Sequence, residues 1–145
     1  GCHGAVIVGS KLLRDYLVNF ARPFIYTTAL PIHDLVVIKM AIENIAIQTN
    51  LRQQLALLVT YFQEQSIQYP AINLLNSNSA IQGIMVRGNE NAFRIATACR
   101  VGGYDVRSII APTVQEGEER LRVVIHAFNS YAEIDELLEI VAEVS

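Results

Sequence analysis

Residues 118–128 read EERLRVVIHAF, a run with the character of a buried strand that also carries two arginines only two positions apart. Successive side chains of an extended chain point to opposite faces of a sheet. Leu121 and Val123 therefore share one face, which is apolar and belongs to a core. Arg120 and Arg122 share the other face, where two like charges repel each other unless an anion lies nearby. The stretch predicts a strand with one buried face and one face that needs a negative partner.

Arg122 is the first candidate binding residue on that second face. A planar guanidinium binds a carboxylate through two parallel hydrogen bonds, which suits it to hold an amino-acid substrate. The alternative is an exposed ion pair with Glu118 or Glu119, as most surface arginines form. The spacing alone does not separate the two interpretations, although simple ion pairs are the more common.

The segments around this strand predict a small two-layer α/β domain. Apolar runs with strand and helix spacing alternate along the chain in the order β-α-β-β-α. Ser130 and Glu133 have the spacing of a capping box, which marks the start of the last helix. The expected elements are a strand at 80–87, a helix that Asn89 caps and that Gly102 and Gly103 close, a strand at 104–110, the arginine strand and the last helix.

The first part of the chain predicts one strand and three helices. Ser10 is expected to cap the first of these helices. A break at Thr49 and Asn50 separates the second helix from the third, and we divide the chain into two domains, residues 1–50 and 51–145. The expected elements are a buried strand at 5–10, a helix to about Arg22, a helix that Pro31 begins and that reaches about Gln48, and a helix at 51–66.

The composition restricts the class of protein. Apolar residues make up 52% of the 145 residues and charged residues 17%, with a mean hydropathy of +0.31. This is apolar for a free-standing small domain and indicates that other protein covers part of the surface. The net charge of -3, without a Lys/Arg cluster, argues against a nucleic-acid partner. No apolar run reaches the roughly 18 residues of a membrane span, so no membrane partner is expected.

Other chemistry finds little support in the sequence. Cys2 and Cys99 are too few for a disulfide framework and have no CxxC spacing, which favours a reducing cytoplasm. The three histidines lie on different segments without ligand spacing, so no metal site is expected. Neither a phosphate-binding glycine motif nor a serine-hydrolase elbow is present, and nucleotide binding and serine hydrolysis therefore lack support.

A pair of hydroxyls forms the second candidate site. Thr27 and Thr28 lie just before a predicted helix start, where free backbone N–H groups and the positive end of the helix dipole favour an anion such as phosphate. Threonines are also common in helix-entry loops that bind nothing. The pair is therefore a candidate phosphate-binding site, and the alternative is a helix-entry loop that binds no ligand.

Three separated motifs occur in an order that resembles a known family. They are GCHGAVIVGS at 1–10, ARPFIYTTALP at 21–31 and GGYDVRSIIAPTVQEGEERLRV at 102–123. Together they resemble the C-terminal portion of the α-oxoamine synthases, pyridoxal-phosphate enzymes of fold-type I that condense an amino acid with an acyl-CoA. The resemblance implies an α/β fold in which 1–50 is the end of the large cofactor-binding domain and 51–145 is the small C-terminal domain.

The resemblance also implies roles for the two candidate sites. In that family the second arginine of the R-L-R element holds the substrate carboxylate, and by position this is Arg122. The hydroxyls that correspond to Thr27 and Thr28 reach the cofactor phosphate of a neighbouring subunit, which implies a homodimer with shared sites. Arg120 receives no such role and is expected to be structural.

The residue that would carry the covalent chemistry falls outside this sequence. The family's Schiff-base lysine sits in a [ST]-x-[GS]-K-x-x-G motif, and Gly1 resembles its last glycine, which places the lysine three residues upstream. The resemblance therefore implies that the chain itself contains no catalytic residue. We expect the 145 residues alone to bind the cofactor weakly or not at all and to turn nothing over.

The form of the second motif favours one family member, the cytoplasmic enzyme of biotin synthesis that joins L-alanine to a pimeloyl thioester on CoA or a carrier protein. Members that acetylate glycine tend to carry Asn where Thr28 stands, and such an enzyme is one alternative. A non-catalytic carboxylate-binding module is the other. The chain departs from the family pattern at Ile32, Gln115 and Asn129, which leaves substrate preference less defined than reaction class.

Overall fold

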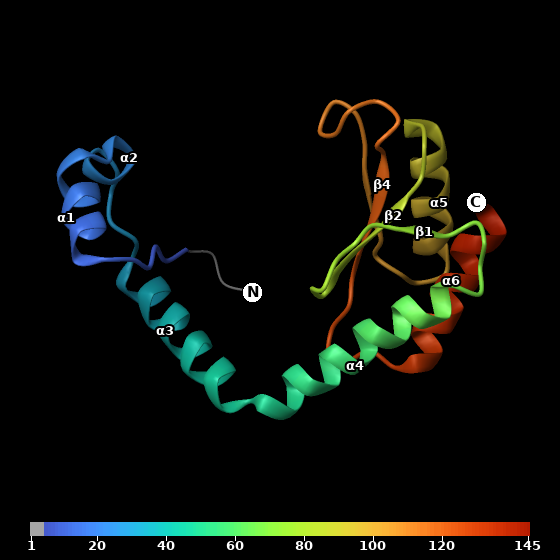
Figure 1. Cartoon of the computed structure of the whole chain (residues 1–145), viewed down its shortest axis with the longest axis horizontal. Coiled ribbons are helices and arrows are strands. Elements are labelled where there is room, and N and C mark those ends of the chain that lie inside the picture. The colour runs from blue at the N-terminus through green and yellow to red at the C-terminus, as the bar shows by residue number, and fades with distance from the viewer. Residues whose placement is uncertain (1–4) are drawn as a thin grey trace. The chain divides into compact units, whose positions relative to one another are not determined.

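The computed structural model describes residues 5–145, and the chain divides into two compact units, Gly1–Thr49 and Asn50–Ser145. Figure 1 follows the helices and strands of each unit along the chain. The expectations that involve Gly1, Cys2 and His3 lie outside the described residues. Within residues 5–145, no helix has both the length and the apolar character needed to cross a lipid bilayer.

The first unit contains three helices, and its described residues form no strand. Ser10 caps the first helix as predicted, because its hydroxyl oxygen accepts a hydrogen bond from the Leu13 N–H at 3.2 Å. The predicted strand at 5–10 is wrong, since no described segment pairs with it to complete its backbone hydrogen bonds. Pro31 is the N-cap of the third helix and lies just before its first turn. The helices are α1 (Lys11–Phe20), α2 (Arg22–Ile25) and α3 (Ile32–Ile47).

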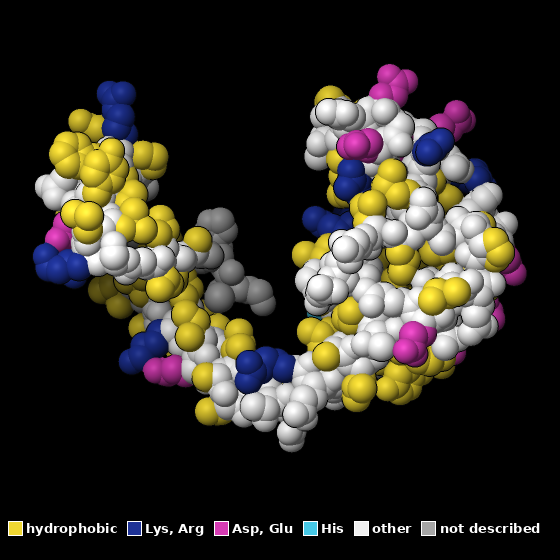
Figure 2. Space-filling model, viewed as in Figure 1, with side chains coloured by type: hydrophobic (Ala, Val, Ile, Leu, Met, Phe, Trp, Pro, Cys, Tyr) yellow, Lys and Arg dark blue, Asp and Glu magenta, His cyan; other side chains and the backbone are white. Residues whose placement is uncertain are grey.

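Apolar side chains of the first unit are exposed along α3. Val36, Val37 and Ile42 point in different directions around the helix axis and are 49%, 48% and 56% exposed. Figure 2 shows hydrophobic side chains gathered over this part of the chain. A helix that is apolar on all sides is typical of a buried position. We therefore expect that the other protein inferred from the composition covers the first unit.

The second unit is a two-layer α/β domain, as predicted from the sequence. Its antiparallel sheet has the strand order β1-β2-β4-β3, and Figure 1 shows α5 and α6 together on one side of it. The two-residue strand β1 was not predicted and adds an edge to the expected β-α-β-β-α order. The elements are α4 (Thr49–Ser66), β1 (Asn73–Leu74), β2 (Ile81–Met85), α5 (Asn89–Val101), β3 (Arg107–Ile109), β4 (Arg120–Val124) and α6 (Tyr131–Val144).

One face of the sheet and the facing sides of the helices form the core. The predicted alternation along β4 is confirmed, since Leu121 and Val123 are buried whereas Arg122 and Val124 are exposed. The predicted capping box is also confirmed, because Ser130 and Glu133 exchange both of its hydrogen bonds at the start of α6. The arginine face of β4 therefore points away from the core. The largest fully buried side chains include those of Phe62, Ile84, Ile95, Leu121 and Leu138.

Helix α5 begins at a glycine that a buried carboxylate holds in place. The N-cap is Gly88, not Asn89 as predicted, and its φ of 89° with ψ of 131° is a conformation that side-chain-bearing residues rarely adopt. The Gly88 N–H donates to Glu119 Oε2 at 3.0 Å, and the Gly117 N–H donates to the same oxygen at 3.0 Å. Glu119 thus joins the loop before β4 to the start of α5. The carboxylate is buried without an arginine partner among the described residues.

We expect Glu119 to make folding stability depend on pH. The Gly88 N–H, with smaller contributions from the N–H groups of Glu119 and Gly117, lowers the pKa of the Glu119 carboxyl below its ordinary value of 4.5. A carboxyl with a depressed folded-state pKa stabilises the fold above its unfolded-state pKa, and this stability is lost as the pH falls through the folded-state pKa. In urea unfolding, Glu119→Gln should be destabilised relative to the wild type at about pH 7 and should lose less stability on acidification to about pH 3.

The matched control is Glu139→Gln on the exposed side of α6. It should leave both the stability at neutral pH and the acid dependence close to those of the wild type. Equal unfolding midpoints for wild type and Glu119→Gln at both pH values would show that the three backbone hydrogen bonds contribute nothing.

Candidate substrate-binding site

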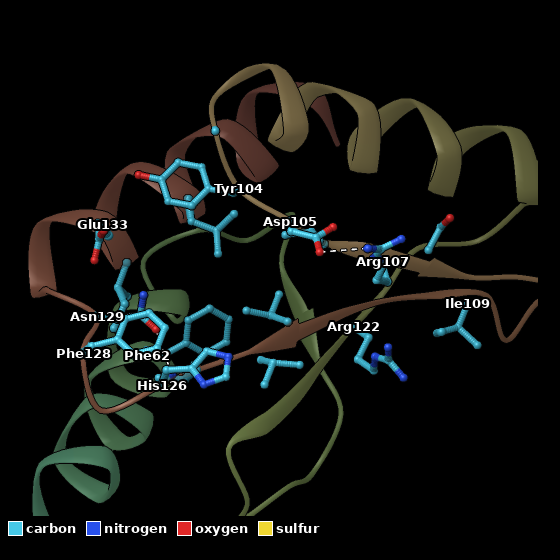
Figure 3. A pocket seen from close by; sticks show the side chains of 18 residues that line it. Phe62, Tyr104, Asp105, Arg107, Ile109, Arg122, His126, Phe128, Asn129 and Glu133 are labelled. Atoms are coloured by element: carbon cyan, nitrogen blue, oxygen red, sulfur yellow. Dashed lines mark hydrogen bonds and ion pairs between the residues drawn. The ribbon is translucent and has the colours of Figure 1, made fainter. Parts of the chain in front are cut away.

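A cleft of about 810 Å³ opens beside the arginine face of β4. Residues of β3 and β4, the segment after β4 and the start of α6 line it, and Phe62 of α4 contributes to its lining (Figure 3). The hairpin of β3 and β4 places the two arginines, Arg107 and Arg122, on directly opposed positions. The cleft lies entirely within the second unit.

Arg122 is available to a ligand in this cleft. Its side chain is exposed and lines the cleft, and among residues 5–145 no carboxylate lies within the 4.0 Å of an ion pair with it. On its other side β4 pairs with β2, where the partner of Arg122 is Gly83, and the apolar side chain of Leu75 occupies the space over this glycine. Figure 3 shows the guanidinium reaching out from the strand. The geometry therefore leaves all five N–H donors of Arg122 free for an anion.

The alternative interpretation, a local ion pair, applies to the neighbouring Arg120 and not to Arg122. Arg120 Nε donates to the Glu118 carbonyl oxygen at 3.0 Å, and its Nη2 lies 3.6 Å from Glu118 Oε2. Glu119, the other proposed partner, accepts backbone N–H groups and faces the start of α5. The sequence pattern places Arg120 and Arg122 on the same strand face. The structure distinguishes them, because only Arg120 has a carboxylate partner among the described residues.

Three lining residues were not singled out from the sequence. Arg107 Nη2 donates to Asp105 Oδ2 at 2.9 Å, so this arginine already has one carboxylate partner. The Tyr104 hydroxyl donates to Glu136 Oε2 at 2.7 Å, and burial together with this hydrogen bond raises the pKa of Tyr104 to about 12. Tyr104 therefore stays protonated at neutral pH and cannot serve there as a general base.

The far end of the cleft is aromatic. The rings of His126 and Phe128 are stacked with centroids 4.8 Å apart and an angle of 6° between their planes. Asn129 fixes this turn, because its Oδ1 accepts the His126 N–H at 2.8 Å. Figure 3 shows the aromatic pair and the arginines at opposite ends of the cleft. A ligand whose carboxylate binds Arg122 would therefore extend toward an aromatic surface.

The second candidate site lies in the other unit. Thr27 and Thr28 are exposed in the segment between α2 and α3. The N-cap of α3, Pro31, makes no side-chain capping hydrogen bond, so the first backbone N–H groups of a 16-residue helix lack a side-chain cap. Asp34 in the first turn opposes an anion there, although it is paired with His33 at 2.9 Å. These hydroxyls and N–H groups have the donor chemistry that a phosphate requires.

Comparison with known proteins finds relatives over nearly the whole chain. No family model matches the chain. The 8-amino-7-oxononanoate synthase of Pseudomonas entomophila is 38% identical over 143 residues, which cover 99% of this chain and 36% of the relative. The chain thus spans little more than a third of the length of the curated relatives it matches.

Two solved structures show the same fold. The 8-amino-7-oxononanoate synthase of Francisella tularensis matches with a TM-score of 0.76 and 27% identity, over 92% of this chain and 39% of the other. A serine palmitoyltransferase from S. paucimobilis, solved with bound PLP and myriocin, matches with a TM-score of 0.77 and 22% identity, over 90% of this chain and 33% of the other. The chain is homologous to the C-terminal part of α-oxoamine synthases, and its sequence relatives include 8-amino-7-oxononanoate synthases.

Proposed function

We propose that these residues are part of a pyridoxal-phosphate-dependent acyltransferase that joins L-alanine to a pimeloyl thioester in biotin synthesis, as 8-amino-7-oxononanoate synthase does. Residues 1–50 end the large cofactor-binding domain, and residues 51–145 form the small domain. The observation that carries the proposal is the unpaired guanidinium of Arg122 in the cleft of a chain that such synthases match over 99% of its length. The relatives support this member of the family over the one that acetylates glycine.

Arg122 binds the amino-acid substrate by its carboxylate. Two parallel charge-assisted hydrogen bonds fix both the position and the plane of the carboxylate, and thus orient the α-carbon. The stacked rings of His126 and Phe128 lie farther along the cleft and present an aromatic surface to the group that extends from the carboxylate. Tyr104 remains a protonated donor to Glu136 and takes no proton from the substrate.

Thr27 and Thr28 contact the phosphate of the cofactor in a neighbouring subunit, so the working enzyme is a homodimer with shared sites. Their exposed hydroxyls and the uncapped start of α3 provide donors of the right kind. When bound, pyridoxal phosphate supplies an electron sink for chemistry at the amino-acid α-carbon. We place this enzyme in the cytoplasm, with its acyl group delivered as a thioester of CoA or of a carrier protein.

The 145 residues by themselves should not turn over substrate. Both lysines of the chain are exposed and ion-paired, Lys11 with Asp15 at 2.6 Å and Lys39 with Glu43 at 3.8 Å, and neither lines a described cleft. No lysine amine is thus placed to form the covalent link to the cofactor. Added pyridoxal phosphate should therefore produce neither a protein-bound absorbance band nor CoA release from an acyl-CoA. A band accompanied by CoA release would contradict this expectation.

The proposed substrates are tested with the full-length enzyme that contains these residues. Its activity is measured with alanine, glycine and serine, each against pimeloyl-CoA and acetyl-CoA, by release of free CoA. The highest kcat/KM is expected for alanine with pimeloyl-CoA. A preference for glycine with acetyl-CoA would instead favour the glycine-acetylating member of the family, and no activity with any pair would refute the acyltransferase assignment.

A further inference from the structure

The two arginines of the cleft occupy directly opposed positions on neighbouring strands of the sheet. Arg107 of β3 and Arg122 of β4 are directly paired in the antiparallel register, so both side chains leave the same face of the sheet. Both are exposed and both line the cleft (Figure 3). Like charges in directly opposed positions destabilise a sheet. An anion between or beside the two groups would relieve this repulsion.

Asp105 supplies only part of that negative charge. Its Oδ2 accepts a hydrogen bond from Arg107 Nη2 at 2.9 Å, which occupies one of the five guanidinium N–H groups. No described carboxylate pairs with Arg122, and Glu133 at the cleft wall is engaged in the capping box of α6. Two positive groups and one negative group leave this end of the cleft with one net positive charge. A single carboxylate would balance it.

We propose that Arg107 is a second substrate-binding residue, which with Arg122 forms a two-arginine clamp on one carboxylate. Asp105 acts as a positioning residue for this clamp. It fixes the Arg107 guanidinium by their hydrogen bond, and its own charge sets the clamp to accept a monocarboxylate in preference to a dicarboxylate. The inference rests on the proposed function, because it adds a residue to the site at which Arg122 binds the substrate carboxylate.

The competing interpretation is that Arg107 and Asp105 form an ordinary surface ion pair. Their side chains are 59% and 68% exposed, and such pairs add little to stability. Stability measurements therefore do not distinguish the two interpretations. Anion selectivity does, because only a clamp shared with Arg122 makes the charge of Asp105 affect which anion binds.

The test is a titration of the isotope-labelled 145-residue chain with acetate and with succinate, followed by the backbone amide shifts of β3 and β4 in NMR spectra. Each dissociation constant is measured for the wild type and for Arg122→Ala, Arg107→Ala, Arg107→Lys and Asp105→Asn. The control is Arg120→Ala, which removes a guanidinium of the same strand that already pairs with Glu118. Spectra without anion establish that each variant keeps the fold.

With the clamp, Arg107→Ala should weaken acetate binding about two- to fivefold, a size typical of an exposed charged contact. Arg107→Lys should fall between alanine and the wild type, because it keeps the charge but loses the planar fork. Asp105→Asn should raise the affinity for succinate relative to acetate, also by about two- to fivefold. Arg120→Ala should leave both constants unchanged.

Different results overturn different parts of the assignment. If Arg122→Ala weakens acetate binding while Arg107→Ala and Asp105→Asn change neither the affinity nor the anion preference, the clamp is refuted and the proposed role of Arg122 stands. If Arg122→Ala leaves acetate binding unchanged, or if neither anion shifts the amides of β3 and β4 in the wild type, the proposed carboxylate site fails and the clamp fails with it.

Discussion

Replacing Arg122 with alanine should weaken amino-acid binding by the full-length enzyme by about 2–4 kcal/mol, or roughly thirtyfold to a thousandfold. The guanidinium has no competing carboxylate among the described residues, so its hydrogen-bonding capacity is available to the substrate. Removal of the side chain deletes two charge-assisted hydrogen bonds at once. Alanine cannot replace either of them.

The loss should appear mainly as a higher KM for the amino acid. KM for the acyl thioester should change little, because Arg122 is assigned only to the amino-acid carboxylate. Arg120→Ala is the matched control, since Arg120 lies two positions away on β4 but is engaged by Glu118. A variant Arg122→Ala with an unchanged KM for the amino acid would remove the basis of the proposed function.

The features that the sequence predicted well are local ones. The faces of β4 follow from the two-residue period of a strand, and the capping box of α6 follows from two residues three positions apart. Ser10 at the start of α1 belongs to the same class. Each of these depends on neighbouring residues only, so the pattern suffices to predict the structure.

The features that were missed depend on contacts between distant residues. The apolar run at 5–10 has strand character, but a strand requires a partner, and none of the described residues pairs with it. Strand β1 is only two residues long and exists because it pairs with β2. The N-cap of α5 is Gly88 because Glu119, 31 residues later, accepts its N–H. None of these pairings has a local signal.

The same contrast between local features and long-range contacts holds for the candidate site. The sequence placed Arg122 on a strand face, but two arginines with the same spacing could not be told apart until the partner of Arg120 was seen. Arg107 and Asp105 could have been noticed as alternating residues of one strand face. Their position opposite Arg122 follows from the register of β3 and β4, and the long loop between these strands does not fix a register as a two-residue turn would.

Replacing Phe62 with alanine should produce the largest loss of stability, about 3–5 kcal/mol. Phe62 is 0% exposed on α4 and is among the largest fully buried side chains of the second unit. Truncation removes the whole ring from the core and leaves a cavity that the surrounding strands and helices fill only in part. Because the net stability of a domain is itself about 5–15 kcal/mol, a loss of this size removes much of it.

The measurement is urea unfolding followed by circular dichroism, with Phe93→Ala as the matched control. Phe93 lies on α5 and is 53% exposed, so the same truncation there should cost far less. Phe62 also contributes to the lining of the cleft, and its loss should therefore loosen the support of the binding face as well as the core. Equal losses of stability in the two variants would mean that Phe62 does not belong to the core of the second unit, and the cleft would then lack part of its lining.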